Sequence, residues 1–556
     1  MITVTIKNTK FNVPRHSSIN DIFQKIKPDW KETVNYQDNP IVGALVNNEL
    51  LPLNSEVDFS CPIVPVKLFS SLGKKMYRHS ICFLLCCSAR ICFPHRNLVI
   101  CHSLGDGYYF NFEDDIVVTE KTIETISKKM IELTQKKISI KKNYIAYQEA
   151  VNHFKELNYK ETSLLLSYRN DPLIETYHLG SYYDLSYEPL ISNTSVLTNW
   201  ELRLYGTQGM LLRYPRSFDF TKLEPFRDNP LLFSVFKEYK NWNKILGVQS
   251  VGQLNQICYK GNIQDYIRLS ESLQAKKIAQ IADKIDSKAV KAVFISGPSS
   301  SGKTTFAKKL CIQLKILGYE AQKISLDDYY LSGSDIPIDE HGEKDYEAFE
   351  ALDIALFQEN IGNLIGGKSV DLPHFNFKIT KRYYKNKPIT LNSKSILVIE
   401  GIHALNPNLI PMIDKNSIYK IYISALTQLN LDNHNRISTT DNRIIRRIVR
   451  DHRSRGTGAF TTLTMWPSIQ RGENFHIFPH QNNADTMLNS ALDYELGVLA
   501  TFAIPLLKTI KPNEGDAYTT ARRLLSVLDC FYPIPETLVP KDSLIREFIG
   551  NGDFED

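Results

Sequence analysis

Residues 292–304 read AVFISGPSSSGKT, and this stretch decides the fold of the second half of the chain. The apolar run 292–295 has the length and composition of a buried strand. Residues 297–304 fit the spacing G-x-x-x-x-G-K-[ST], and the residues after them have the apolar spacing of a helix. A strand, a glycine-rich loop and a helix in this order predict a phosphate-binding loop, or P-loop. The alternative is a Gly/Ser loop that matches the spacing by chance. Such a loop would not be expected to have a strand directly before it and a helix directly after it.

Each position of this loop has a chemical reason. Backbone N–H groups of the turn and the positive end of the helix dipole attract a triphosphate. We expect Lys303 to reach the β- and γ-phosphate oxygens and Thr304 to offer its hydroxyl to Mg²⁺. ATP and Mg²⁺ are therefore the predicted cofactors. The predicted nucleotide contacts of the loop are Gly297, Pro298, Ser299, Ser300, Ser301, Gly302, Lys303, Thr304 and Thr305.

Acidic residues follow two predicted strands downstream of the loop. Asp327 and Asp328 come directly after the strand 321–326, and Glu400 follows the apolar strand 395–399. Ligands of open α/β sheets bind beyond the carboxyl ends of strands, so Asp327 is placed to accept a proton from an incoming hydroxyl. Asp328 is the second choice, and a helix N-cap is the alternative role for either. Glu400 has the position of a Walker B acid, which predicts a Mg²⁺ ligand; a carboxylate at a helix N-terminus is the alternative.

A third element is rich in arginine, with six arginines between residues 443 and 455. On a helix, residues three and four apart share a face, so most of these guanidinium groups point the same way. Such groups bind phosphate oxygens, and on a mobile segment they can neutralise charge on a transferring phosphoryl group. A nucleic-acid-binding stripe and a solvated basic helix are the alternatives. The predicted ATP contacts on this element are Arg450, Arg453 and Arg455.

The order of these elements, with DYEAFEALD at 345–353 and LPHFNF at 372–377, resembles the uridine-cytidine kinase branch of the phosphoribulokinase/uridine kinase family. The resemblance implies that Asp327 is the general base for a ribose 5′-hydroxyl and that Glu347 binds ribose hydroxyls. It also implies that Arg443 and Arg446 contact sugar and phosphates. The resulting catalytic set is Lys303, Asp327 and Arg446. The resulting substrate-binding set is Asp327, Tyr330, Glu347, Phe375, Phe377 and Arg443.

Two positions depart from that family. Phe375 stands where the family has a tyrosine that hydrogen-bonds a pyrimidine, and Thr380 stands where a histidine reads the base edge. A site that lacks its hydrogen-bonding groups loses much of its discrimination between bases. The resemblance therefore predicts phosphoryl transfer but leaves recognition of uracil open.

Composition indicates a folded protein of several domains. A chain of 556 residues exceeds one core, and its 43% hydrophobic content is typical of globular proteins. The net charge of +5 suits anionic small molecules but is small for a dedicated nucleic-acid binder. Five of the nine cysteines crowd residues 82–101 without the spacing of a zinc site. We therefore expect buried free thiols in a cytoplasmic protein without a signal peptide or a membrane span.

The first 65 residues have the pattern of a small β-grasp module. Alternating residues predict a strand at 2–6, an extended run follows at 10–13, a helix ends at Ile26, and 41–46 is a further strand. This order resembles the TGS domain at the front of threonyl-tRNA synthetases and of some GTPases. The resemblance implies a ubiquitin-like fold for this module.

Residues 66–225 form a second α+β unit. Its motifs are RHS at 78–80, FP at 93–94 and GDGYYFNF at 105–112. They resemble the second N-terminal domain of threonyl-tRNA synthetase, which edits mischarged tRNA with a His-x-x-x-His pair and a later Cys-x-x-x-His. His79 is kept here, but Phe83, Ser186 and Leu190 stand at the other three positions. We expect no editing activity from such a pocket, and we expect His79 to be a core histidine.

The predicted fold class is multidomain α/β and α+β, with a mostly parallel sheet in the P-loop domain. The charged, helix-patterned stretch in the middle is expected to pack the two halves together. The predicted domains are a TGS-like β-grasp domain at 1–65, a synthetase-like α+β domain at 66–225, a helical linker at 226–286, a uridine kinase-like P-loop domain at 287–530 and a C-terminal extension at 531–556.

These observations favour an ATP-dependent kinase that phosphorylates the 5′-hydroxyl of uridine or cytidine, as in pyrimidine salvage. A P-loop kinase for another small hydroxyl compound, such as a sugar phosphate or a pantothenate-like alcohol, is the second hypothesis. The third is an ATP-controlled regulator that contacts tRNA or the ribosome through the N-terminal domains. The expected partner is a small-molecule nucleoside and not a membrane, while a homo-oligomer stays open.

Overall fold

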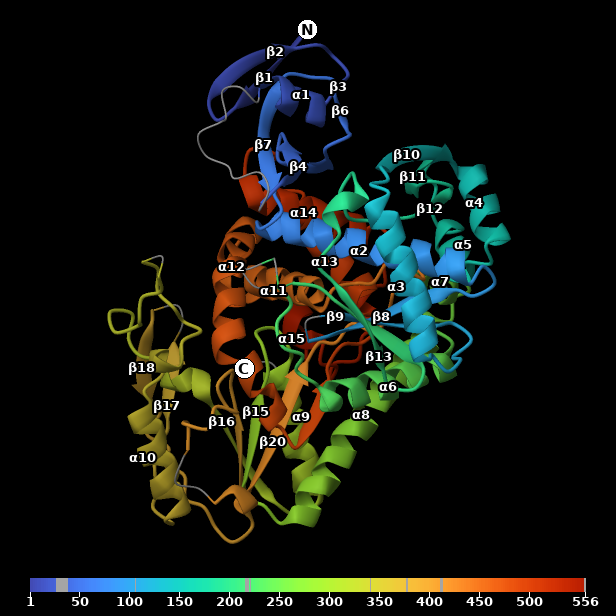
Figure 1. The fold of residues 1–556 in the computed structure, drawn as a ribbon. Helices are drawn as coiled ribbons and strands as arrows, with labels where there is room; N and C mark the ends of the chain where they lie inside the picture. The colour runs from blue at the N-terminus through green and yellow to red at the C-terminus, as the bar shows by residue number, and fades with distance from the viewer. Residues whose placement is uncertain are drawn as a thin grey trace.

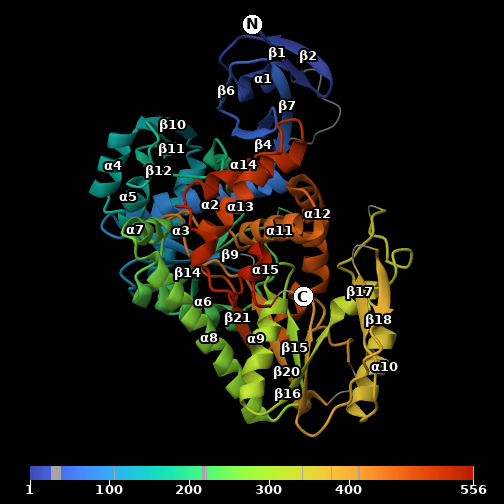
Figure 2. The ribbon, with the colours of Figure 1, turned by 180° about the vertical axis from the view of Figure 1, so that it is seen from behind.

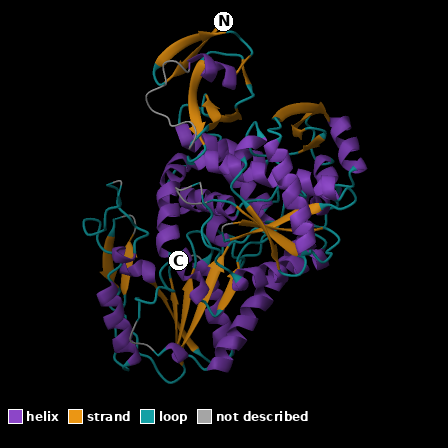
Figure 3. Ribbon diagram, viewed as in Figure 1, coloured by secondary structure: helices purple, strands orange, loops and turns teal. Residues whose placement is uncertain are grey.

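The computed structural model describes residues 1–26, 39–105, 107–215, 220, 222–340, 342–376, 379–410 and 414–554. A small N-terminal sheet and the helices below it stack against a second half that is built on one fan-shaped sheet (Figure 1). Helices lie beside the sheets in both halves, and the small N-terminal sheet has one helix (Figure 3). Among the described helices, none has both the length and the apolar character that a bilayer crossing requires.

The N-terminal region is a mixed sheet with one helix. Its elements are β1 (Ile2–Ile6), β2 (Thr9–Val13), β3 (Ser17–Ser18), α1 (Ile19–Ile26), β4 (Ile41–Val46), β5 (Glu49–Pro52), β6 (Glu56–Val57) and β7 (Cys61–Lys67). The strand order is β2-β1-β7-β4-β5, and β1 runs parallel to β7 in its centre. The apolar residues of α1 pack on this sheet because their spacing puts them on one helix face. The strands expected at 2–6 and 41–46 therefore coincide with β1 and β4.

The second region is built around a long buried helix, α2. Its elements are α2 (Ser71–Cys92), β8 (Leu98–Leu104), β9 (Gly107–Phe112), α3 (Glu120–Gln135), β10 (Ile140–Ala146), α4 (Tyr147–Glu156), α5 (Lys160–Leu166), β11 (Leu173–Leu179), β12 (Tyr182–Asp184), η2 (Thr194–Val196), β13 (Glu201–Tyr205) and β14 (Gly209–Arg213). One sheet has the order β13-β14-β9-β8 and the other β10-β11-β12. Cys82, Cys86 and Cys87 lie on α2 inside the core. His79 differs from the core histidine we expected, because it is half-buried and lines a cavity.

Three helices connect this region to the second half: α6 (Pro230–Leu246), α7 (Val251–Tyr259) and α8 (Ile263–Lys288). The long α8 runs along the second half, as the view from behind shows (Figure 2). Ile278, Ile281 and Ile285 of α8 enter the main core of that half, together with the residues of the central strands. The helical linker therefore forms part of the core that supports the sheet.

The second half contains a parallel sheet with helices on both sides. The strands are β15 (Ala292–Ser296), β16 (Glu320–Ser325), β19 (Ser395–Glu400), β20 (Ile418–Ser424) and β21 (Thr486–Asn489). Their order is β16-β19-β15-β20-β21, and every pairing is parallel. The near-continuous apolar runs of β15 and β19 follow from burial on both faces. The predicted parallel sheet is confirmed.

Further elements complete this half. The helices are α9 (Lys303–Ile316), α10 (Ile354–Ile365), α11 (Thr439–Arg455), α12 (Ala459–His476), α13 (Glu495–Leu507), α14 (Gly515–Leu528) and α15 (Arg546–Ile549). The short 3₁₀ segments are η3 (Leu326–Tyr329), η4 (Phe349–Ala351), η5 (Lys415–Ser417), η6 (Phe478–Asn483) and η7 (Glu536–Leu538). A hairpin of β17 (Pro373–Asn376) and β18 (Lys381–Tyr384) stands with α10 at the side of the sheet (Figure 1).

The two halves are joined by backbone hydrogen bonds as well as by apolar packing. Ile100 of β8 donates its backbone N–H to the carbonyl oxygen of Asn433 at 2.9 Å, and the side-chain Nδ2 of Asn430 donates to the carbonyl oxygen of Ile100 at 2.7 Å. Thr519 of α14 donates to the carbonyl of Asn48 at 2.8 Å. The front half therefore contacts both the segment that precedes α11 and the helix α14.

Candidate active site

The P-loop has the backbone shape that its glycines allow. Gly302 has a φ of +84°, in the left-handed region that favours glycine, and it caps the N-terminus of α9. A Cβ at Gly297 would lie 2.0 Å from the carbonyl oxygen of Ile423, so the loop passes too close to β20 for a side chain. The Nζ of Lys303 donates to the carbonyls of Gly297 at 2.9 Å and Pro298 at 3.1 Å. The lysine is therefore folded over its own loop.

A cluster of oxygen atoms lies beside the loop. The carboxylate oxygen Oε1 of Glu400 accepts hydrogen bonds from Thr304 at 3.2 Å and from Ser325 at 3.1 Å. Burial raises the pKa of Glu400 to about 7, and the charge of Asp327 contributes to the same shift. Oxygen donors are what Mg²⁺ prefers, and a cation here would favour the ionised form of Glu400. The residues present therefore fit a magnesium site.

Ser325 belongs to this cluster but has no place in the sequence-based prediction. It is the last residue of β16 and pairs in register with Glu400 of β19. A register argument that aligned the carboxyl ends of the two strands could have found it.

The two aspartates after β16 have different surroundings. The Oδ1 atom of Asp328 accepts the backbone N–H of Phe375 at 3.0 Å, and its other oxygen lies 3.8 Å from the Nδ1 of His374. Asp328 therefore anchors the β17–β18 hairpin. Asp327 makes no hydrogen bond or ion pair within the described part of the chain, although its charge contributes to raising the pKa of Glu400 and Glu347. This difference agrees with the choice of Asp327 as the base candidate.

Aromatic side chains line the space next to Asp327. The rings of Tyr330 and Phe375 have centroids 6.0 Å apart, and the hydroxyl of Tyr330 donates to the carbonyl of Tyr346 at 2.9 Å. Glu347 lies under α12, where a Cβ at Gly472 would come within 2.2 Å of the Glu347 Cβ. Phe377, a further predicted substrate contact, lies outside the described residues.

Two of the arginines on the predicted phosphate-binding face are buried and paired with carboxylates. The guanidinium group of Arg443 binds Glu473 of α12 and donates to the carbonyl of Ser299 at 2.9 Å. Arg446 is fully buried and donates to Glu495 of α13 at 2.6 Å. Buried guanidinium groups require anions beside them, and packing of α12 and α13 supplies these.

Arginines of α11 also donate hydrogen bonds to the P-loop. Arg446 donates to the carbonyl of Ser300 at 3.3 Å, and Arg447 donates to the hydroxyl of Ser299 at 2.7 Å. Their contacts are with the P-loop itself, so α11 supports the loop in this conformation. Glu473 and Glu495, which make this possible, carry no local motif and were not among the predicted residues.

The arginines at the end of α11 form a second group. Arg450 lies 2.8 Å and Arg455 lies 3.7 Å from Asp451. Burial acts to raise the pKa of Asp451, but the neighbouring arginines outweigh it and lower the pKa below the usual range. Arg453 donates to the backbone carbonyl of Glu547 at 3.2 Å.

The C-terminal segment reaches the P-loop helix. The carboxylate of Glu547 accepts the backbone N–H of Thr305 at 3.1 Å and its hydroxyl at 2.8 Å. An anion at the N-terminus of a helix is favoured by the helix dipole, so Glu547 occupies a phosphate-like position. Lys309 of the same helix binds Asp542 at 3.1 Å. The predicted C-terminal extension therefore contacts the helix that follows the P-loop, which no motif in its sequence indicates.

The second half of the chain is similar to known kinases. Residues 292–495 match the Phosphoribulokinase / Uridine kinase family. A uridine kinase of Macrococcus caseolyticus is 31% identical over 196 residues, which are 35% of this chain and 85% of that protein. The solved structure of a possible uridine kinase from Bacillus stearothermophilus aligns with 38% of this chain and 98% of its own, at 15% identity and a TM-score of 0.27.

The front half has a different relative. A threonine–tRNA ligase of Ehrlichia chaffeensis is 26% identical over 189 residues, which are 34% of this chain but only 28% of the ligase. The chain thus joins a ligase-like N-terminal region to a C-terminal kinase region. Because the P-loop region matches a relative over most of that relative's length, we conclude that this protein is an ATP-dependent kinase and belongs to the phosphoribulokinase/uridine kinase family.

Proposed function

We propose that this kinase transfers the γ-phosphoryl group of ATP to the 5′-hydroxyl of uridine or cytidine, as a cytoplasmic enzyme of pyrimidine salvage. The observation that carries the proposal is the position of Asp327. It follows β16 beside Glu400 and the P-loop, and among the described residues it has no partner of its own. A carboxylate in that position is available for an incoming hydroxyl.

Each residue of the site has a task in this reaction. Amides of the P-loop and the Nζ of Lys303 hold the triphosphate, which requires Lys303 to leave the loop carbonyls. Thr304 and Glu400 would hold Mg²⁺, which supplies positive charge at the phosphate oxygens when bound. Asp327 accepts the proton of the hydroxyl as the bond to phosphorus forms. The chain contributes position and electrostatics, because phosphoryl transfer needs little covalent chemistry from the protein.

The aromatic rings of Tyr330 and Phe375 can contact a planar base, but they offer little discrimination between one base and another. The Tyr330 hydroxyl donates to a backbone carbonyl, and Phe375 carries no hydroxyl. Both rings can contact a base through their faces. We therefore expect uridine and cytidine to be accepted at similar rates, with less discrimination than a hydrogen-bonded pocket would give.

An acceptor panel tests the proposal. Purified full-length protein with ATP and Mg²⁺ should release ADP at least about tenfold faster with uridine or cytidine than with adenosine, a sugar phosphate or pantothenate, a difference of about 1.4 kcal/mol. The Lys303→Ala variant is the control for contaminating kinases. A better acceptor outside the nucleosides would replace the pyrimidine assignment but keep the kinase. Absence of turnover with every acceptor would favour the second candidate, a tRNA-binding regulator, which the ligase-like region supports.

The pH dependence of acceptor binding gives a further prediction. Burial raises the pKa of Glu347 to about 7, Glu473 and Asp327 act in the same direction, and Arg447 and Lys303 oppose them. A raised pKa means that Glu347 is ionised above about pH 7 and neutral below it. The ionised form accepts stronger hydrogen bonds from ribose hydroxyls, so KM for the nucleoside should rise up to about tenfold between pH 8 and pH 6.

Steady-state kinetics across this pH range measure the effect. The Glu347→Gln variant keeps the volume of the side chain and cannot titrate, so its KM should be high and independent of pH. A wild-type KM that is flat between pH 6 and pH 8 would show that Glu347 does not bind the ribose.

We also propose that the domain division at 1–65, 66–225, 226–286, 287–530 and 531–556 holds, with the first module being of the TGS type. The parallel pairing of β1 with β7 supports that assignment. The contacts of Glu547 and Asp542 with α9 indicate that the last segment functions with the kinase domain.

A further inference from the structure

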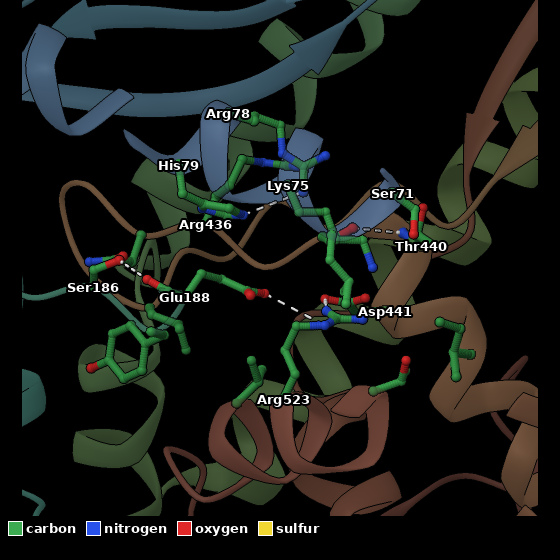
Figure 4. Close-up of a pocket in the computed structure, with 18 of the residues that line it drawn as sticks. Ser71, Lys75, Arg78, His79, Ser186, Glu188, Arg436, Thr440, Asp441 and Arg523 are labelled. Carbon is green, nitrogen blue, oxygen red and sulfur yellow. Dashed lines mark hydrogen bonds and ion pairs between the residues drawn. The ribbon is translucent and has the colours of Figure 1, made fainter. Parts of the chain in front are cut away.

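A cavity of about 540 Å³ lies between the ligase-like region and the helices of the kinase half. It is bordered by α2, by the loop after β12, by the first turn of α11, and by α12 and α14. Figure 4 shows Lys75, Arg78 and Arg436 around the same space as Glu188 and Arg523. The kinase site described above uses none of these residues.

Three cationic side chains of the cavity have donor atoms without an acceptor in the described structure, although the Nη2 of Arg78 lies 3.4 Å from the Nε2 of His79. Lys75 makes no hydrogen bond or ion pair with another described residue, and burial, together with Arg523, lowers its pKa to about 8. The Nε and Nη2 atoms of Arg436 and the Nε of Arg78 are buried without a hydrogen-bond acceptor in the described structure. Both guanidinium groups lie over the ring of Tyr108, at 5.7 Å for Arg78 and 5.3 Å for Arg436. Buried donors are normally satisfied, so this cluster requires an explanation.

The acids of the cavity do not neutralise these cations. Arg523 already binds Glu188 at 3.6 Å and also pairs with Asp441. With Lys75, Arg78 and Arg436, four cations therefore share two acids, which leaves two positive charges. Burial, reinforced by the nearby Arg78, holds the pKa of His79 well below its usual range, so this histidine adds no charge.

The other acids that line the cavity do not neutralise the excess positive charge beside Lys75, Arg78 and Arg436. Asp184 pairs with His434 at 2.5 Å. Glu514 accepts a backbone bond from Lys511, and Asp516 is exposed at the start of α14. The charge near Lys75, Arg78 and Arg436 stays positive.

We propose that this cavity is a second ligand site, which binds a small phosphorylated compound of the size of a nucleoside monophosphate. A phosphate monoester is a dianion with several acceptor oxygens, which matches the charge and the free donors of Lys75, Arg78 and Arg436. Trp466 also lines the cavity, and its buried Nε1 has no acceptor among the described residues. An aromatic wall with one free donor suits the planar, polar body of such a compound.

The position of the cavity connects it to the nucleotide site. Thr440, Asp441 and Ile444 of α11 line the cavity, while Arg443 and Arg447 of the same helix bind Ser299 of the P-loop. One helix therefore borders both sites. The proposal does not rest on the acceptor that the kinase uses, since it depends on other residues.

Titration calorimetry on the full-length protein tests the site, with AMP, UMP and inorganic phosphate as probes and uridine as the unphosphorylated control. We expect a binding event for a nucleoside monophosphate whose Kd rises at least tenfold in Lys75→Gln and in Arg436→Gln. The matched control is Lys128→Gln, which removes a charge of the same sign from an exposed position on α3 and should bind as the wild type does. Equal affinity for inorganic phosphate would identify free phosphate as the source of the shared chemistry.

Two further measurements keep the test independent of misfolding and of the kinase assignment. Thermal unfolding of ligand-free Lys75→Met should show no loss of stability, because an unpaired buried cation is removed, while the shift caused by the ligand should disappear. ADP release by Arg436→Gln with its best acceptor should stay at the wild-type level. The proposal is overturned if no probe binds, if tRNA binds but no small phosphate does, or if Lys75→Gln and Arg436→Gln bind as the wild type does.

Discussion

Replacing Asp327 by asparagine should lower kcat by about 100- to 10,000-fold, the range that a general base contributes, and leave the Kd for ATP unchanged. Asparagine has nearly the same volume but cannot take the proton of the acceptor hydroxyl. The side chain follows β16 and makes no hydrogen bond or ion pair with the P-loop among the described residues, so the triphosphate should bind as before. Coupled measurement of ADP release gives kcat, and calorimetry with a non-hydrolysable ATP analogue gives the Kd.

Asp328 offers a matched control for this variant. Its Oδ1 accepts the N–H of Phe375, and the side-chain oxygen of asparagine can accept the same bond. Asp328→Asn should therefore change kcat less than tenfold, although it removes the same charge one residue away. Equal losses in the two variants, or a normal kcat in Asp327→Asn, would remove Asp327 from the role of base.

Glu495→Ala should have the largest effect on stability. The carboxylate of Glu495 binds Arg446, which is fully buried. It also accepts the backbone N–H of Leu492 at 3.1 Å. Its removal leaves a buried guanidinium group without an anion, which costs about 3–5 kcal/mol. The midpoint of thermal unfolding of the kinase half should fall by on the order of 10 °C.

A double variant separates the lost charge from the lost packing. Arg446→Met with Glu495→Leu replaces the ion pair by apolar side chains of similar size, and it should recover most of the stability that Glu495→Ala loses. A thermal midpoint for Glu495→Ala equal to that of the wild type would show that Arg446 finds another anion or solvent.

The sequence was sufficient to predict those structural elements that depend on residues close together in the chain. Residues 292–304 require a buried strand, a tight glycine turn and a helix start, and each of these depends on neighbours within a few positions. The strands expected at 321–326 and 395–399 end within one residue of β16 and β19, because apolar runs of this length form buried strands. Together they predicted the P-loop, the parallel sheet and the pair Thr304–Glu400.

Other features depend on residues far apart in the chain. Asp327 and Asp328 are neighbours at the end of one strand, and the hydrogen bond that Asp328 accepts from Phe375, 47 residues further on, could not be predicted from the sequence. Helical spacing predicted that most of the arginines share one face, but it did not predict that Arg446 is buried and bound to Glu495 of α13. Which guanidinium group meets phosphate and which meets a carboxylate depends on packing between helices, and helical spacing does not contain that information.

The sequence by itself therefore determined the phosphate-binding loop, the acids after two strands and the likeness of each half to a known family. The tertiary structure alone decided that Glu547 lies on the P-loop helix and that Lys75, Arg78 and Arg436 share one cavity. The physical reason is that backbone shape is set by local sterics and hydrogen bonding. The pairing of a charge is set by which distant segments exclude water around it.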